Sequence, residues 1–230
     1  MLLPLHDKNP LRVLPFQIVT ASLMALAVIG FALQLAGGWP EQGQGIIDGF
    51  ALVPVSLLGG DGGSPLAELW TLLTYTFLHA DFWHLAGNLL FLWVFGDNVE
   101  DAMGHLRFLV FFLLCGAVAG LAHALGTGDS TIGLVGASGA ISGVLGAYLM
   151  LHPKVKVLVL VLKWFPVFLP AYFVLGAWVV LQFVGIAMSA NGDASGVAFG
   201  AHLGGFVAGL VLVPFFRRAD VPLFDRGVEH

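Results

Sequence analysis

The residues that could do chemistry are few, and they lie in stretches of otherwise apolar sequence. His84 and Asn88 are four residues apart, Ser138 lies in Gly136-Ala137-Ser138-Gly139, and His202 interrupts an apolar run. A polar side chain in such a stretch is costly if lipid surrounds it, so each one needs a reason to be there. A serine hydroxyl is a poor nucleophile unless a neighbouring base takes its proton, and histidine is the commonest such base. Ser138 and His202 are therefore the candidate nucleophile and general base.

The segment Gly136-Ala137-Ser138-Gly139 predicts a tight turn into a helix that starts at Ser138, because glycine adopts backbone conformations that other residues avoid. The first turn of a helix has unpaired N–H groups, which favour the negative charge of a tetrahedral oxyanion. His84 and Asn88 share a helix face and offer further donors to that oxyanion. The structural alternatives are a serine N-cap for Ser138, an interhelical hydrogen bond for His202, and a polar helix cap for the other two.

No carboxylate is placed to complete a triad. Asp129 and Asp193 fall in loops, and Asp97 and Glu100 lie at the far end of the helix that would carry His84. We therefore expect a Ser–His dyad whose imidazole is oriented by packing or by a neutral partner.

The composition indicates a membrane around these residues. Of the 230 residues, 58% are hydrophobic and 10% are charged, whereas soluble domains carry about 25% charged residues. A helix needs about 20 apolar residues to cross a bilayer, which predicts an all-α, multi-pass fold in one membrane domain over residues 1–230. Its six expected spans are 16–35, 84–95, 108–125, 138–151, 167–188 and 197–216, of which the fourth is unusually short. The lipid bilayer is thus a partner, and no nucleic-acid partner is expected.

The basic residues support this count independently. All nine lie on one side of the expected spans, in the two terminal segments and in alternate loops. They are Lys8, Arg12, Arg107, Lys154, Lys156, Lys163, Arg217, Arg218 and Arg226. Cytoplasmic loops of membrane proteins are enriched in Lys and Arg. We therefore expect both the N-terminal segment 1–15 and the tail 217–230 to be cytoplasmic. The second, fourth and sixth spans then all run inward from the external side, so Ser138 and His202 occupy similar depths below the outer surface.

Glycines on two of the expected spans favour a close approach between them. They are Gly200, Gly204, Gly205 and Gly209 on the sixth span and Gly139, Gly143 and Gly146 on the fourth. Small residues let transmembrane backbones approach closely. Such packing would bring Ser138 within hydrogen-bond reach of His202.

Other functions fit the sequence less well. Gly126-Thr127-Gly128-Asp129 has the letters of an aspartyl intramembrane protease motif, but that chemistry needs a second aspartate within a neighbouring span. A zinc protease would place His-Glu-x-x-His on a helix, and His79 and His84 have the wrong spacing. A transporter would explain intramembrane histidines, yet the inverted repeat typical of many transporters is missing.

The motifs taken together resemble those of the rhomboid family of intramembrane serine proteases. They are His79-x4-His84-x3-Asn88, Gly136-Ala137-Ser138-Gly139 and Ala201-His202-x2-Gly205-x3-Gly209, on spans two, four and six. The resemblance implies a bundle with a short central fourth helix and a water-filled cavity open to the outside. It implies Ser138 as nucleophile, His202 as base, and His84 with Asn88 in the oxyanion hole.

The resemblance also implies transmembrane protein substrates cut near the external surface, with no metal or organic cofactor, and it makes Glu100 a structural acid. Two positions depart from the family pattern: Trp70-Thr71 stands where many members have Trp-Arg, and Ser142 stands where some place an aromatic residue against the histidine ring. A catalytically inactive relative that binds transmembrane helices is the main alternative. The expected location is a prokaryotic inner membrane, with an organelle membrane as the alternative.

Overall fold

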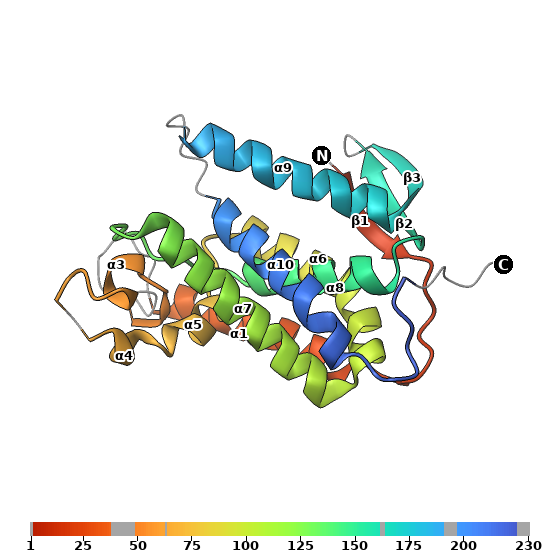
Figure 1. The fold of residues 1–230 in the computed structure, drawn as a ribbon, viewed down its shortest axis with the longest axis horizontal. Coiled ribbons are helices and arrows are strands. Elements are labelled where there is room, and N and C mark those ends of the chain that lie inside the picture. The colour runs from red at the N-terminus through yellow and green to blue at the C-terminus, as the bar shows by residue number, and fades with distance from the viewer. Residues whose placement is uncertain (1, 38–48, 63, 162–163, 191–196, 225–230) are drawn as a thin grey trace.

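The computed structural model describes residues 2–37, 49–62, 64–161, 164–190 and 197–224. Most of them form helices, which lie side by side with a small sheet at one end (Figure 1). The long helices are α1 (Ile18–Ala36), α6 (Phe82–Met103), α7 (His105–Thr127), α8 (Ser138–Leu151), α9 (Ala171–Ala190) and α10 (Phe199–Phe216).

Four of these described helices are long and apolar enough to cross a membrane, namely α1, α7, α9 and α10. Helix α6 is longer than its expected span of 84–95, because it continues through the polar stretch Asp97–Asp101 to Met103. Helix α8 has 14 residues and runs from Ser138 to Leu151, the bounds expected from the sequence. The molecule is therefore a multi-pass membrane protein.

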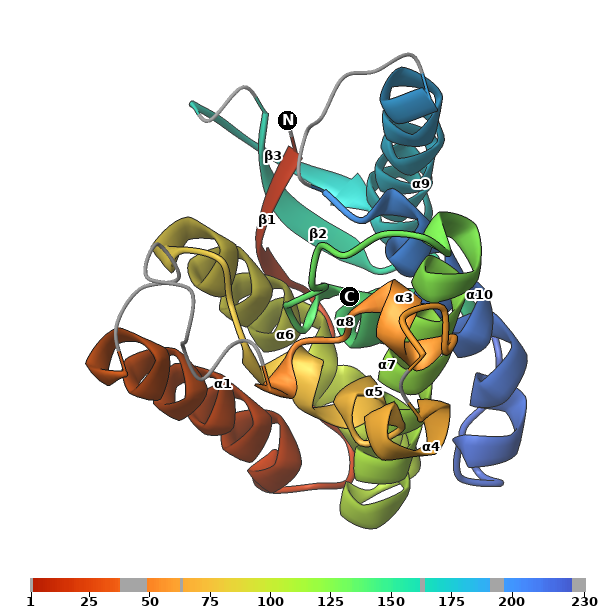
Figure 2. The ribbon, with the colours of Figure 1, turned by 90° about the vertical axis from the view of Figure 1, so that its left-hand side faces the viewer.

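Helix α8 lies inside the bundle. It contacts α6, α7, α9 and α10, and Figure 2 shows it among the other long helices. Tyr148 of α8 packs edge-on against Phe95 of α6, with ring centroids 4.9 Å apart, and both side chains are buried. Helices that precede and follow α8 in the sequence thus surround it in the fold.

A three-stranded antiparallel sheet corrects the expected all-α class. Strand β2 (Lys156–Val161) lies between β1 (Leu2–Asp7) and β3 (Phe165–Pro170). Burial alternates along β2, with Val157 and Val159 buried, which fits a strand with one face on the core. The fifth helix begins at Ala171 rather than at residue 167, since Pro166 and Pro170 favour an extended chain at those positions.

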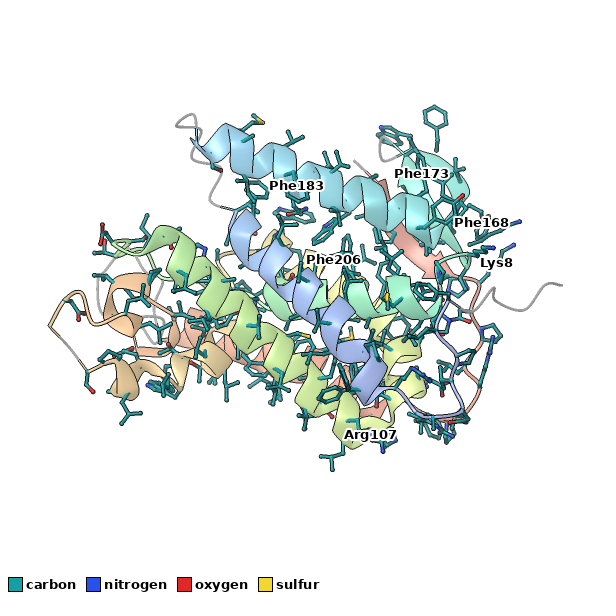
Figure 3. All side chains as sticks on the ribbon, viewed as in Figure 1. Lys8, Arg107, Phe168, Phe173, Phe183 and Phe206 are labelled. Atoms are coloured by element: carbon teal, nitrogen blue, oxygen red, sulfur yellow. The ribbon has the colours of Figure 1, made fainter. Side chains whose placement is uncertain are left out.

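The sheet is joined to the bundle through Asp7. Its carboxylate accepts hydrogen bonds from the Tyr148 hydroxyl at 2.5 Å and from the Asn98 amide at 3.1 Å. On the outer face, the Lys8 ammonium lies 4.1 Å from the centre of the Phe168 ring (Figure 3). The N-terminal segment, expected only to be cytoplasmic, therefore carries a strand that packs against α6 and α8.

Acidic residues at the end of α6 hold the start of α1. The buried Glu100 carboxylate accepts from the backbone N–H groups of Val19 and Thr20 at 2.9 and 2.7 Å, and from the Thr20 hydroxyl at 2.6 Å. Asp101 accepts from three successive N–H groups, those of residues 12–14. These carboxylates satisfy backbone donors ahead of and within the first turn of the helix, so they are structural.

The segment between α1 and α6 supports the loop before α8. Its short helices are α3 (Pro54–Leu57), α4 (Pro65–Glu68) and α5 (Thr71–Thr74), followed by a 3₁₀ turn at Tyr75–Phe77. Leu52 pairs with Leu134 as an isolated bridge, and the Gly136 N–H donates to the Tyr75 carbonyl at 2.9 Å. At the Trp70-Thr71 departure, Trp70 packs edge-on against Phe50 at 4.9 Å. The turn that precedes Ser138 is thus fixed from outside the helix.

Candidate active site

Ser138 and His202, which are 64 positions apart in the sequence, come together at the starts of two helices that run in the same direction. Ser138 is the first residue of α8, and His202 lies in the first turn of α10, where its N–H donates to the Ala198 carbonyl. The distance from Ser138 Oγ to His202 Nε2 is 2.8 Å. Both residues are partly exposed.

The close approach of α8 and α10 explains this contact. A Cβ atom built on Gly205 would overlap with the Gly139 carbonyl oxygen, and one on Gly209 would overlap with that of Gly143. The two backbones therefore touch directly, which is possible only because glycine has no side chain. Gly139 is itself enclosed by Ala119, whose Cβ would lie 2.6 Å from an added methyl group.

The His202 ring is held by α9, which the sequence analysis did not anticipate. Its Nδ1 atom lies 2.8 Å from Oε1 of Gln182, a buried residue, and Trp178 lies against the ring with centroids 5.9 Å apart. Phe199 packs edge-on at 6.4 Å. Ser142, noted above as a departure from the aromatic residue of some family members, donates its hydroxyl to the Ser138 carbonyl at 2.6 Å.

Gln182 is a site residue that the sequence did not predict, because no motif includes it. A usable signal was present, since a glutamine in the middle of an apolar span is costly in lipid. Trp178 and Gln182 are four residues apart and so share one helix face. That face meets α10: Trp178 also packs on Phe206, which Figure 3 shows on the side of α10 toward α9.

His84 and Asn88 lie next to the turn that precedes Ser138. Gly136 has a φ of +120°, and an added Cβ there would lie 2.7 Å from His84 Nε2 and 3.7 Å from Asn88 Nδ2. The Asn88 amide nitrogen is buried and has no hydrogen-bond partner among the described residues. A buried donor without a partner carries a desolvation cost, which a negatively charged ligand would offset.

His79 is buried behind this turn rather than within it. Its ring packs edge-on against His84 at 5.4 Å, while its backbone N–H and C=O are both bonded to the buried Gln34 side chain of α1, at 2.9 and 3.0 Å. His79 thus fixes the entry to α6. Among the described residues, no three or more His, Cys, Asp or Glu side chains gather as metal ligands.

The assembled groups have the chemistry of acyl transfer. The arrangement supplies a hydroxyl beside an imidazole, N–H groups at a helix start, and an unpartnered amide donor, and these are the parts that nucleophile activation and oxyanion stabilisation need.

Comparison with known proteins gives matches in one family. A model described as the rhomboid domain matches residues 66–219. Rhomboid protein 1, mitochondrial, of Saccharomyces cerevisiae is 35% identical over 155 residues, which are 62% of this chain and 40% of that relative. Rhomboid-like protein 11, chloroplastic, of Arabidopsis thaliana is 31% identical over 167 residues, 68% of this chain and 56% of that relative. Rhomboid protease GlpG of Haemophilus influenzae is 27% identical over 147 residues, 63% and 68% respectively.

The matches bear on family and location differently. The chain spans less than two thirds of the length of the first two relatives. These relatives are named for a mitochondrion and a chloroplast, so they give the expected prokaryotic location no support. The family model, in contrast, covers more than half of the sequence and includes every candidate site residue. The chain therefore belongs to the rhomboid family.

Proposed function

We propose that this protein is an intramembrane serine endopeptidase that cleaves transmembrane protein substrates near the external membrane surface. The observation that carries the proposal is the 2.8 Å contact between Ser138 Oγ and His202 Nε2, at the start of a buried helix. One relative is named a rhomboid protease, which supports the same chemistry.

The proposed topology has six spans, with α6 and the short α8 crossing alongside the four longer apolar helices. Both termini and the sheet then lie on the cytoplasmic side, where the basic residues gather. This arrangement puts the first turns of α6, α8 and α10 below the external surface. The water that the reaction needs would reach Ser138 from that side.

In the proposed reaction, Ser138 Oγ attacks the scissile carbonyl carbon of a locally unwound substrate helix while its proton passes to His202 Nε2. The carbonyl oxygen becomes an oxyanion, which accepts hydrogen bonds from Asn88 Nδ2, from His84 and from the first-turn N–H groups of α8. His202 then gives the proton to the leaving amine, and the C–N bond breaks. Water attacks the resulting ester by the reverse use of the same groups, which releases the acid and restores the serine.

Two measurements test the proposal. A fluorophosphonate should label the wild-type protein covalently at Ser138, and the Ser138→Ala and His202→Ala variants should resist labelling. Cleavage of a reporter transmembrane substrate in proteoliposomes should be lost in the same variants, with their expression unchanged. A wild-type protein that neither labels nor cleaves would instead be an inactive relative that binds transmembrane helices.

A further inference from the structure

Gln182 makes two hydrogen bonds, one with His202 and one with the Trp178 carbonyl. The bond to the carbonyl fixes which end of the Gln182 amide faces His202. Its Oε1 atom lies 2.8 Å from His202 Nδ1, and its Nε2 donates to the Trp178 carbonyl of the preceding turn at 3.1 Å. A carbonyl oxygen only accepts, so the amide nitrogen must face Trp178. The oxygen of the same amide must therefore face His202.

This orientation fixes the protonation of the imidazole. Because Gln182 Oε1 is an acceptor, His202 Nδ1 must carry the hydrogen in the neutral ring. The Nε2 atom then has a free lone pair, and it is this atom that lies 2.8 Å from Ser138 Oγ. A ring with its hydrogen on Nε2 would donate to the serine and would be unable to accept its proton.

We propose that Gln182 is the positioning residue of this site, which selects the His202 tautomer that acts as a base. This proposal rests on the proposed function, in which Ser138 and His202 perform the chemistry. The neutral amide differs from the carboxylate of a Ser-His-Asp triad, because it orients the ring but adds no charge to balance the imidazolium. The site thus has the geometry of a triad, with Gln182 as its third residue, but it lacks the negative charge that a carboxylate would supply.

The surroundings of His202 give the hydrogen bond this selective role. Trp178 and Phe199 contact the ring through their aromatic faces and edges, so they restrict its plane without distinguishing its two nitrogens. Gln182 is 6% exposed, which keeps water from replacing the amide as acceptor. Loss of the amide oxygen would leave the ring in place, but an Nδ1–H group would then be a buried donor without an acceptor. The hydrogen would move to Nε2, which faces the Ser138 hydroxyl.

The test compares Gln182→Met, which keeps the length of the side chain and removes its acceptor, with Gln182→Glu, which keeps an acceptor. Val184→Met, at an exposed position of the same helix, is the matched control. We expect Gln182→Met to lower kcat by about 100-fold, within the range for loss of a general base, with KM within about twofold of wild type. Gln182→Glu should recover most of that loss, and the acidic limb of its pH–rate profile should move to higher pH, because a carboxylate stabilises the imidazolium. Val184→Met should match wild type.

A second readout needs no turnover. In protein with ¹⁵N-labelled histidine, the wild-type His202 resonances should show a protonated Nδ1 and an unprotonated Nε2. Gln182→Met should show the hydrogen almost entirely on Nε2, because a 100-fold lower kcat requires that only about 1% of the rings keep the active tautomer. Wild-type kcat in a folded Gln182→Met variant, equal losses in the Met and Glu variants, or a wild-type His202 protonated on Nε2 would each overturn the proposal. A wild-type protein that shows the Nδ1–H tautomer but no fluorophosphonate labelling would instead refute the proposed protease function.

Discussion

The glycine contact between α8 and α10 allows the sharpest test of how the fold builds the site. In Gly205→Ala, the new Cβ would overlap with the Gly139 carbonyl, whereas in Gly200→Ala on the same helix it would meet no atom within 4 Å. The two variants make the same chemical change in one helix. They differ only in what the added methyl group touches.

The magnitude follows from the distances. Ordinary contact between a Cβ and another heavy atom begins near 3.4 Å, so α10 must move from α8 by at least about 1 Å to relieve the overlap. A displacement of this size would lengthen the 2.8 Å Ser138–His202 contact beyond hydrogen-bond range. Misplacement by 1 Å costs about 100-fold in rate, and overpacking costs roughly 1–3 kcal/mol of stability.

The assay is the rate of fluorophosphonate labelling, measured with the Tm of the detergent-solubilised protein. Gly205→Ala should label about 100-fold more slowly and lose several degrees in Tm, on the scale of about 2–4 °C per kcal/mol for a chain of this size. Gly200→Ala should label at the wild-type rate and keep or slightly raise the Tm, because alanine is favoured over glycine in a helix. Wild-type labelling by Gly205→Ala would refute the idea that backbone contact sets the distance between Ser138 and His202.

Three further changes separate chemistry from stability. Asn88→Ala should lower kcat by about 10²- to 10³-fold, the usual cost of one oxyanion donor. The Tm should stay unchanged, because the buried amide nitrogen has no hydrogen-bond partner to lose. A lower Tm with normal kcat would make Asn88 structural. Burial raises the pKa of Asp7 from 3.8 to about 7. The stability linked to its protonated form is therefore complete below about pH 4 and is lost as pH rises through about 7. The Tm of wild type should fall across that window, and in Asp7→Asn this part of the fall should be absent. Glu100→Gln replaces one of two accepting oxygens with an N–H group, which must face the donors of either Val19 or Thr20. The change should cost about 2 kcal/mol, seen as a lower Tm with an unchanged labelling rate per folded molecule.

The sequence predicts those parts of the fold whose conformation is determined by the residues of a single segment. The helix Ser138–Leu151 follows from its glycine turn and apolar run, and it has the expected bounds. The sheet could not be predicted in this way, because Leu2–Asp7 becomes a strand only by pairing with Lys156–Val161. The local sequence allows such a segment to adopt an extended conformation, but pairing with a distant segment is what makes it a strand.

The same distinction applies to the site. Ser138, His202, His84 and Asn88 were identified because each carries polar chemistry at a span end that topology places at one depth. Gln182 acts through one interhelical hydrogen bond, 20 residues from its partner, and no span-end rule points to it.

The departure at Ser142 and the contact at Gln182 have one explanation. A small residue at 142 leaves α8 without an aromatic surface for the His202 ring, and its hydroxyl turns back to the Ser138 carbonyl. The ring is supported from α9 instead, through Trp178 and Gln182. Helix α9 meets the bundle mainly along α10 and lies at its outer side (Figure 1). Orientation of His202, the proposed base, therefore depends on a peripheral helix, whereas the position of Ser138, the proposed nucleophile, depends on the buried helix α8. A displacement of α9 would therefore release the His202 ring while leaving Ser138 in place.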